Sequence, residues 1–231
     1  MFFVRNGKTL HEGRNIVKLL EIDGVKFVVK SFVRISTFNR VLYGSLRKSK
    51  AMRSYLHAIR LRRLGIDTPE EVAVAEVRRR GMMRYCYYIS RYSDYAPLSP
   101  VTERYMRSDE AKAVLDALVQ FLAKMHWAGV LHRDLNVGNI LWKQTATDGG
   151  AQYAFQIIDI NRMSFKTTLS MRQRLNNLRR LSCGASAYLY ILQQYAAEID
   201  RNSDTVQLKG VFRRLLFEQR QRAKRKVKSY I

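Results

Sequence analysis

The 231-residue sequence predicts an α+β protein in which a small β-rich part precedes a helical part. Early in the chain, β-rich runs are separated by turn residues, most clearly by the pair Asp23-Gly24. Two of the three prolines fall within 93–100, which indicates a connection between parts. Beyond it, apolar residues recur at helical spacing. We therefore expect a β-rich part, a hinge and a helical part over residues 1–92, 93–100 and 101–231.

The first part carries signals for two hairpins around one helix. Asp23-Gly24 is the dipeptide that two-residue hairpin turns favour, and Arg80-Gly81 predicts a second turn. A helix precedes Gly65, a residue typical of the position just after a helix. The expected elements are strands over 15–22, 25–32, 71–77 and 85–91, with the helix over about 45–64.

The second part is predicted to be helical. Ser108 marks a helix start, because its hydroxyl and the acids after it suit the unpaired N–H groups of a first turn. Apolar residues at helical spacing indicate that this helix is largely buried, namely Val114, Leu118, Phe121, Leu122 and Met125. Further helices are expected over 168–197 and 205–227.

The charge of the chain predicts an anionic partner. It has 42 basic and 19 acidic residues, a formal net charge of +23. Such a surface attracts nucleic acid, an anionic membrane or a phosphorylated substrate, and charge alone does not choose among them. Two cysteines without metal-ligand spacing, no secretory signal and no long apolar run predict a reduced cytosolic protein with at most peripheral membrane contact.

The strongest chemical signal is His132-Arg133-Asp134 with Asn139 five residues after the aspartate. It matches the H-R-D-x-x-x-x-N catalytic loop of kinases at every fixed place. Asp159 follows the apolar pair 157–158, where kinases carry a metal-holding aspartate. Asp134 would orient the acceptor hydroxyl and accept its proton, whereas Asn139 and Asp159 would give Mg²⁺ the oxygen ligands it prefers. For isolated residues, turn-forming Asp and Asn would be the simpler interpretation.

Two further residues are candidates for binding the phosphates of ATP. Lys30 ends a strand where kinases place the lysine that contacts the α- and β-phosphates, and Lys26 is its nearest competitor. Gly13 lies where a hairpin could pass over the nucleotide, although no G-x-G-x-x-G is present and a glycine at such a place is more often a plain turn residue.

The usual partner of that lysine is missing. No Asp or Glu occurs between residues 31 and 66, so the predicted helix cannot supply a glutamate for Lys30. Either another acid pairs with it, from Glu12, Glu21, Glu70 or Glu71, or the phosphates and Mg²⁺ organise it directly. His126, on the apolar helix, is expected to be a core residue, and His132 to be a structural brace.

Three segments resemble one known family. Leu-Gly-Ile-Asp-Thr-Pro-Glu (64–70), His-Arg-Asp-Leu-Asn-Val-Gly-Asn-Ile-Leu (132–141) and Ile-Asp-Ile-Asn-Arg-Met (158–163) together are similar to the lipopolysaccharide core kinases. This is the Kdo and heptose kinase family of Gram-negative bacteria. The resemblance spans about residues 10–200, and its specific stretch is 132–163.

The resemblance implies a two-lobed, protein-kinase-like fold and ATP- and Mg²⁺-dependent phosphorylation of a Kdo or heptose hydroxyl. The acceptor would be a lipid-linked core oligosaccharide at the cytoplasmic face of the inner membrane. Carried over residue by residue, Asp134 becomes the base, Asn139 and Asp159 the metal ligands, and Lys30 the phosphate-binding lysine. The basic C-terminal run 209–228 would suit an anionic membrane surface, or equally a helical cap followed by a solvated tail.

Three alternatives remain open from the sequence. A protein kinase would normally carry an Ala-Pro-Glu segment after the metal-binding aspartate, and none follows here. A kinase-like pseudoenzyme is compatible with the missing acid. A basic nucleic-acid-binding protein has charge as its sole support, since no recognised nucleic-acid motif is present.

Overall fold

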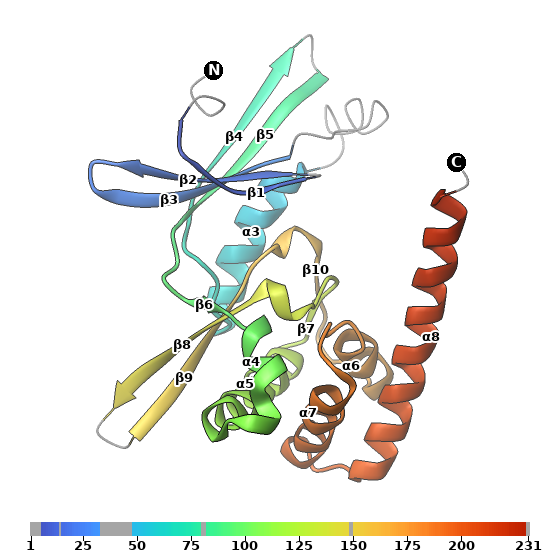
Figure 1. Cartoon of the computed structure of the whole chain (residues 1–231). Coiled ribbons are helices and arrows are strands. Elements are labelled where there is room, and N and C mark those ends of the chain that lie inside the picture. Colours follow the sequence, from blue (N-terminus) through green and yellow to red (C-terminus); the bar gives the residue numbers. More distant parts are fainter. Residues whose placement is uncertain (1–5, 14, 33–47, 80–81, 148–149, 230–231) are drawn as a thin grey trace. The chain divides into compact units, whose positions relative to one another are not determined.

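The computed structural model describes residues 6–13, 15–32, 48–79, 82–147 and 150–229 (Figure 1). The chain divides into two compact units. The first contains Met1–Asp94 together with Ile157–Arg162, and the second contains Tyr95–Gln156 together with Met163–Ile231. The sequence predicts that the segment with Asp159 belongs with residues 101–231, whereas the structure places Ile157–Arg162 in the first unit.

The first unit is built on an antiparallel sheet (Figure 1). Within the described residues its strand order is β1-β2-β3-β5-β4. The bounds are β1 Lys8–Glu12, β2 Ile16–Ile22, β3 Val25–Ser31, β4 Glu71–Arg79 and β5 Met82–Arg91. Asp23 and Gly24, with φ of 50° and 75°, form the β2–β3 turn. Both predicted hairpin pairings are confirmed, and Arg80-Gly81 lies outside the described residues.

Helix α3 (Lys50–Arg63) packs against this sheet. Ser49 caps its start, because the hydroxyl accepts a hydrogen bond from the Met52 N–H at 2.9 Å. At its end, Gly65 takes φ 69° and the Ile66 N–H reaches the Leu61 carbonyl at 3.0 Å, which is the Schellman arrangement. The predicted helix is confirmed with a later start, and residues 45–47 of that prediction lie outside the described ranges.

The core of the first unit lies between α3 and the sheet. One cluster of buried side chains there comes from the residue just after β3, from α3 and from β5, namely Phe32, Ala51, Met83, Cys86 and Tyr88. Lys30 is paired in register with Tyr88, so the alternation of side chains along β3 places it on this face of the sheet. Packing around Phe32 and Tyr88 therefore fixes the strand that carries Lys30.

The second unit is mainly helical. Helix α5 (Asp109–Trp127) is capped by Ser108, whose hydroxyl accepts from the Ala111 N–H at 3.2 Å. This confirms the predicted start, and the predicted buried face is confirmed except that Phe121 is half-buried. The other helices are α4 Ser99–Arg104, α6 Met171–Leu178, α7 Ala185–Glu198 and α8 Ser203–Ser229, with short 3₁₀ turns η1 Tyr105–Arg107 and η2 Val137–Asn139.

Short strands complete the second unit. They are β6 Ala96–Pro97, β7 Val130–His132, β8 Ile140–Thr147, β9 Gly150–Ile157 and β10 Met163–Phe165. Among the described residues β6, β8 and β9 form one sheet, and β7 pairs with β10 antiparallel. The last residue of β9, Ile157, and the turn η3 Ile160–Arg162 belong to the first unit.

The predicted helix over 168–197 is wrong in one respect, since it is two helices. Helix α6 ends at Leu178, and α7 begins after Gly184, which has an extended backbone with ψ 159°. The segment between them turns through Arg179 and Arg180 and returns the chain for α7. The helix predicted over 205–227 is confirmed as α8.

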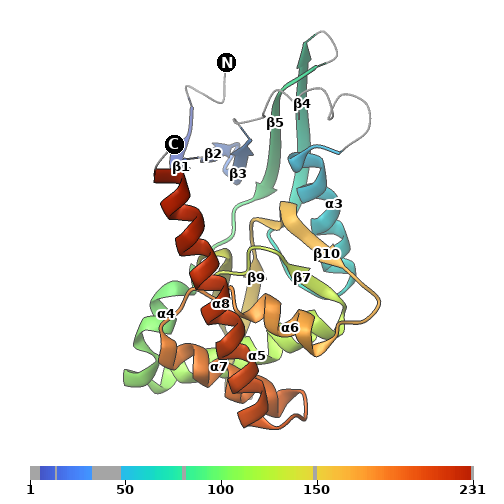
Figure 2. The ribbon, with the colours of Figure 1, turned by 90° about the vertical axis from the view of Figure 1, so that its right-hand side faces the viewer.

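Helix α8 packs on α6 and α7 (Figure 2). Its contact with α7 is close because Gly210 has no side chain, and a Cβ there would lie 2.5 Å from Leu192 Cδ1. Tyr188 also donates a hydrogen bond from its hydroxyl to the Gly210 carbonyl at 3.3 Å. A mid-helix glycine costs about 1 kcal/mol relative to alanine, and here it permits this approach.

Candidate active site

Asp159 is held by its backbone in the first unit. Before it, the Thr68 hydroxyl donates to the Ile157 carbonyl at 2.7 Å, and the Ile157 N–H donates to the Asp67 carbonyl at 3.1 Å. Asp159 itself has φ 56°, in the left-handed region that L residues other than Asn and Asp seldom adopt. Such strain of about 1 kcal/mol persists where surrounding contacts fix the backbone, and it is common at functional sites.

Lys30 and Asp159 form an ion pair. Lys30 Nζ lies 2.7 Å from Asp159 Oδ1, with the two side chains 16% and 29% exposed. Asn161 donates to the same oxygen through Nδ2 at 2.5 Å. Within the described part of the chain, both of these contacts go to Oδ1, so Oδ2 is free to act as an oxygen ligand.

The ion pair shows that Asp159 is the acid that pairs with Lys30, in place of a glutamate on the helix. The two glutamates next to the helix are used elsewhere, since Glu71 binds Arg62 at 2.5 Å and Glu70 binds Arg91 at 3.0 Å. Lys30 is thus the candidate lysine that pairs with the predicted metal ligand. Lys30 also lies over the Phe32 ring, 5.5 Å from its centroid.

His57, a residue that the sequence did not single out, fixes the chain directly after Asp159. It lies on α3, and its Nδ1–H donates to the Ile160 carbonyl at 2.7 Å. Burial lowers the pKa of His57, which favours the neutral ring. No sequence signal links these residues, because they are 103 positions apart in the chain.

The predicted catalytic loop is compact within the second unit. The Asp134 N–H donates to His132 Nδ1 at 3.1 Å, and Asn139 donates through Nδ2 to the Asp134 carbonyl at 2.9 Å. His132 is fully buried, which agrees with its predicted role as a brace. The amide of Asn139 is thus oriented through its nitrogen, and no described residue donates to its oxygen.

A buried hydrogen-bond network of side chains from α5, α6 and α7 supports this loop. His126 Nε2–H donates to Asn177 Oδ1 at 3.1 Å, and Asn177 Nδ2 donates to the His132 carbonyl at 2.6 Å. The other ring nitrogen, Nδ1, accepts from the Tyr195 hydroxyl at 2.7 Å. Burial lowers the pKa of His126 to about 4, so the ring is neutral and one tautomer satisfies both partners. His126 is the core residue that the sequence predicted.

Gly13 lies at the turn between β1 and β2, at an exposed position. Its N–H donates to the Asn15 carbonyl at 3.2 Å. A Cβ at this position would meet the His11 ring, whose Nε2 lies 3.1 Å away, so an adjustment of one side chain would accommodate it. The turn is a hairpin end in the sheet that carries Lys30, and its surroundings do not demand glycine.

Asp159 and Asn139 carry the type of ligand atom that Mg²⁺ prefers, namely oxygen. Mg²⁺ is bound by one or two protein oxygen ligands and completes its octahedron with water and phosphate oxygens. Asp159 offers a carboxylate oxygen in the first unit, and Asn139 offers an amide oxygen in the second. Among the described residues there is no group of three or more His, Cys, Asp or Glu side chains that could hold a metal by themselves.

Comparison with known proteins identifies the family. The model of the lipopolysaccharide kinase (Kdo/WaaP) family matches residues 4–201, most of the chain. The chain belongs to this family. The predicted resemblance is therefore confirmed, and the stretch that carries Lys30, Asp134, Asn139 and Asp159 lies inside the match.

A solved structure has the same fold as this family member. The structure described as WaaP in complex with acyl carrier protein matches with a TM-score of 0.61 and 18% sequence identity, over 96% of this chain and 90% of that one. The protein-kinase-like α+β fold predicted from the sequence is thereby confirmed.

A rice protein (Oryza sativa subsp. japonica) with the assigned name cyclin-dependent kinase F-2 is 33% identical over 97 residues. The match covers 40% of this chain and 27% of the rice protein, so the chain spans about a quarter of the length of that relative. In the described ranges no helix has the length and hydropathy that crossing a bilayer requires.

Proposed function

We propose that the chain is an ATP- and Mg²⁺-dependent kinase that phosphorylates a sugar hydroxyl of the lipopolysaccharide inner core. Its acceptor would be Kdo or heptose on a lipid-linked core oligosaccharide. Membership of the lipopolysaccharide kinase family supports the reaction class. The observation that carries the proposal is the 2.7 Å pair between Lys30 and Asp159, because it combines a phosphate-binding cation with a metal-binding carboxylate.

Each candidate residue has a separate role in this proposal. Lys30 binds the α- and β-phosphates of ATP, and the β1–β2 turn with Gly13 covers them. Asn139 and Asp159 would each supply a side-chain oxygen ligand to Mg²⁺, which when bound would neutralise charge on the phosphates. Phosphoryl transfer requires mainly such positioning and charge neutralisation, and little covalent chemistry from the protein.

Asp134 acts on the acceptor in this proposal. Its carboxylate orients the sugar hydroxyl and accepts its proton as the hydroxyl oxygen bonds to the γ-phosphorus and ADP leaves. The contacts of the loop suit this role, since His132 and Asn139 hold the backbone of Asp134 and leave its side chain half-buried. His132, Asn177 and His126 act as positioning residues behind it.

The proposed location is the cytoplasmic face of the inner membrane, with peripheral attachment through α8. Three apolar side chains of this helix are exposed at helical spacing, Leu208 at 74%, Phe212 at 61% and Leu215 at 54%. We call these three residues the α8 stripe. The same helix carries nine Lys or Arg residues and one acid over 209–228. An apolar stripe on a basic helix is typical of attachment to anionic lipid surfaces.

Mass spectrometry of lipopolysaccharide from cells with and without the gene tests the reaction and names the acceptor together. The expected result is one class of core oligosaccharide that lacks a phosphate in the deletion strain, restored by the wild-type gene. Complementation with Asp134→Ala should leave the phosphate missing. An unchanged phosphate content in the deletion strain would contradict the proposal, and Mg²⁺-independent ATP binding by the purified protein would then favour a pseudoenzyme.

A further inference from the structure

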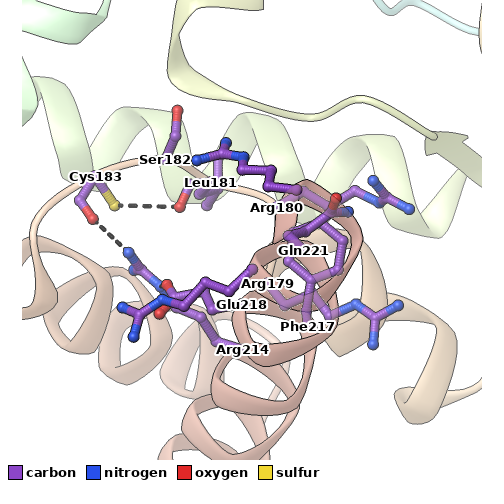
Figure 3. Close-up of a pocket in the computed structure, with 11 residues that line it drawn as sticks. Arg179, Arg180, Leu181, Ser182, Cys183, Arg214, Phe217, Glu218 and Gln221 are labelled. Atoms are coloured by element: carbon purple, nitrogen blue, oxygen red, sulfur yellow. Dashed lines mark hydrogen bonds and ion pairs between the residues drawn. The ribbon is translucent and has the colours of Figure 1, made fainter. Parts of the chain in front are cut away.

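A pocket outside the proposed phosphoryl-transfer residues lies in the helical unit, formed by the segment between α6 and α7 together with α8 (Figure 3). The pocket has a volume of about 380 Å³, at the lower end of the range for small-molecule sites. Its lining includes five arginines and one acid, namely Arg179, Arg180, Arg214, Arg222, Arg225 and Glu218. None of these belongs to the residues proposed for phosphoryl transfer.

The positive charge of the pocket is poorly compensated. Glu218 is engaged by Arg214, whose Nε lies 2.8 Å from Oε1. Arg179 and Arg180 each lie 5.0 Å from the centroid of the Phe217 ring, so two guanidinium groups share one aromatic side chain. Burial and the nearby charge of Arg180 lower the pKa of Arg179, which indicates that cations crowd one another here.

Guanidinium groups in the pocket also have unused hydrogen-bond donors. Arg179 Nε and Arg214 Nη1 are buried and have no hydrogen-bond partner among the described residues. The other terminal nitrogen of Arg214 fixes the guanidinium group, since Nη2 donates to the Cys183 carbonyl at 2.7 Å. Figure 3 shows this contact on one side of the hollow and Arg180 on another. A buried polar group without a partner requires an explanation, and an absent anion is one.

We infer that this pocket binds a phosphate monoester group. Arginine recognises phosphate through paired, charge-assisted hydrogen bonds, and several arginines around one hollow match a doubly charged anion better than a singly charged one. A covalent role for Cys183 does not fit, because burial raises the pKa of its thiol and keeps it protonated. The phosphate could be carried by a lipid or by a soluble sugar, and the chemistry of recognition is the same.

Binding of inorganic phosphate to the full chain, measured by calorimetry at constant ionic strength against chloride, tests the inference. Arg179→Gln with Arg180→Gln should raise the Kd for phosphate about tenfold or more, since each charge-assisted hydrogen bond contributes that much. Arg222→Gln with Arg225→Gln is a second variant on exposed positions of α8, where folding is not at risk. Arg107→Gln, an exposed arginine outside the pocket, should leave the Kd unchanged.

Two controls distinguish phosphate binding in this pocket from binding at the proposed ATP site. Lys30→Met should retain the phosphate binding that the pocket variants lose, because Lys30 belongs to the other unit. The pocket variants should retain Mg²⁺-dependent ATP binding. Failure of the kinase proposal would thus leave this test intact, and the reverse also holds.

Vesicles identify the source of the phosphate. Phosphatidylcholine vesicles with phosphatidic acid carry a phosphate monoester, whereas those with phosphatidylglycerol carry a diester. If a lipid supplies the group, the wild-type chain prefers phosphatidic acid and the pocket variants lose that preference; if a soluble sugar phosphate does, no preference appears while inorganic phosphate still binds. The inference would be overturned if phosphate bound the wild type no better than chloride does. It would also be overturned if both pocket variants bound phosphate as tightly as the wild type does.

Discussion

Lys30 Nζ and Asp159 Oδ1 are 2.7 Å apart in the first unit, although the two residues are far apart in sequence. In many kinases the corresponding lysine pairs with a glutamate on the helix of the β-rich lobe. Here α3 has no acid, and Ser54 in its middle is buried with its hydroxyl donating to the Lys50 carbonyl at 3.0 Å. The carboxylate proposed to bind Mg²⁺ therefore also positions the lysine.

This shared role predicts coupled effects in a double-mutant cycle. Lys30→Met and Asp159→Asn should each weaken Mg²⁺-dependent ATP binding by about tenfold or more, since each removes a charged contact to the nucleotide or its metal. Because the two side chains touch, the double variant should lose less than the sum, with a coupling energy of about 1 kcal/mol. Calorimetric titration of ATP with and without Mg²⁺ measures both quantities.

The matched control is Asp200→Asn. Asp200 also has a positive φ, 52°, and an exposed side chain at the end of α7. It should bind ATP as the wild type does, which separates the function of Asp159 from its backbone conformation. Strictly additive losses in the cycle would contradict a functional link between Lys30 and Asp159.

Asp134→Ala should separate turnover from nucleotide binding. The proposed contact of Asp134 is to the acceptor hydroxyl, so the variant should lose at least about a hundredfold in kcat while its ATP affinity changes little. Transfer of labelled γ-phosphate to core oligosaccharide measures the first, and calorimetry the second. Wild-type turnover by Asp134→Ala would remove this residue from the mechanism.

His57 should influence ATP binding without touching the nucleotide. His57→Leu removes the donor to the Ile160 carbonyl, so the backbone after Asp159 loses a hydrogen bond that contributes about 1 kcal/mol. We expect the Mg²⁺ concentration for half-maximal ATP binding to rise several-fold. His57→Asn, which offers an amide N–H near the position of Nδ1, should restore most of the affinity. Equal behaviour of the two variants would indicate that packing, and not this hydrogen bond, is responsible.

His126 should make the protein less stable in mild acid. Its pKa is about 4 in the folded chain against 6.5 in the unfolded one, so below pH 6.5 the unfolded state binds a proton that the folded state does not. The free energy of unfolding should therefore fall between pH 6.5 and pH 4, by up to about 3 kcal/mol from this residue. Above pH 6.5 the ring is neutral in both states and the contribution is constant.

Urea unfolding of His126→Gln at several pH values checks this sign. Glutamine can accept from Tyr195 and donate to Asn177 yet does not titrate, so the variant should show a shallower decline below pH 6.5. His11→Gln, on an exposed strand, should keep the wild-type slope. The lowered pKa of His57 acts in the same direction and is present in all three proteins, so the difference between curves isolates His126.

The parts of the fold that the sequence predicted are those governed by local chemistry. The Asp23-Gly24 turn, the Ser108 cap and Gly65 after α3 each need a specific residue type at one position, and each is found as predicted. The break between α6 and α7 was missed because Gly184 can also be accommodated within a helix at modest cost.

Contacts between distant residues were not predictable in the same way. The motif predicts Asp134, Asn139 and Asp159 by spacing, but no pattern in the sequence indicates that Lys30 pairs with Asp159 rather than with one of the glutamates. The contact of His57 with Ile160 depends on how α3 packs, which no local pattern encodes. The arginine pocket was hidden for a similar reason, since Arg179 and Arg180 precede α7 whereas Arg214 lies in a basic run that resembles a solvated tail.

The α8 stripe predicts attachment to anionic membranes that depends on apolar contact as well as charge. Leu208→Ser, Phe212→Ser and Leu215→Ser together should reduce partitioning onto phosphatidylglycerol vesicles at least about tenfold, because burying each of these side chains contributes about 1.5 kcal/mol or more. The fold should survive, since the face of α8 that packs on α7 carries Gly210 instead. Sedimentation with vesicles measures the effect. High salt should also reduce the partitioning of the wild type, because it screens the attraction between charges. Glu103→Gln, an exposed change outside α8, serves as the control. Unchanged partitioning of the folded triple variant would show that this stripe does not contact the bilayer.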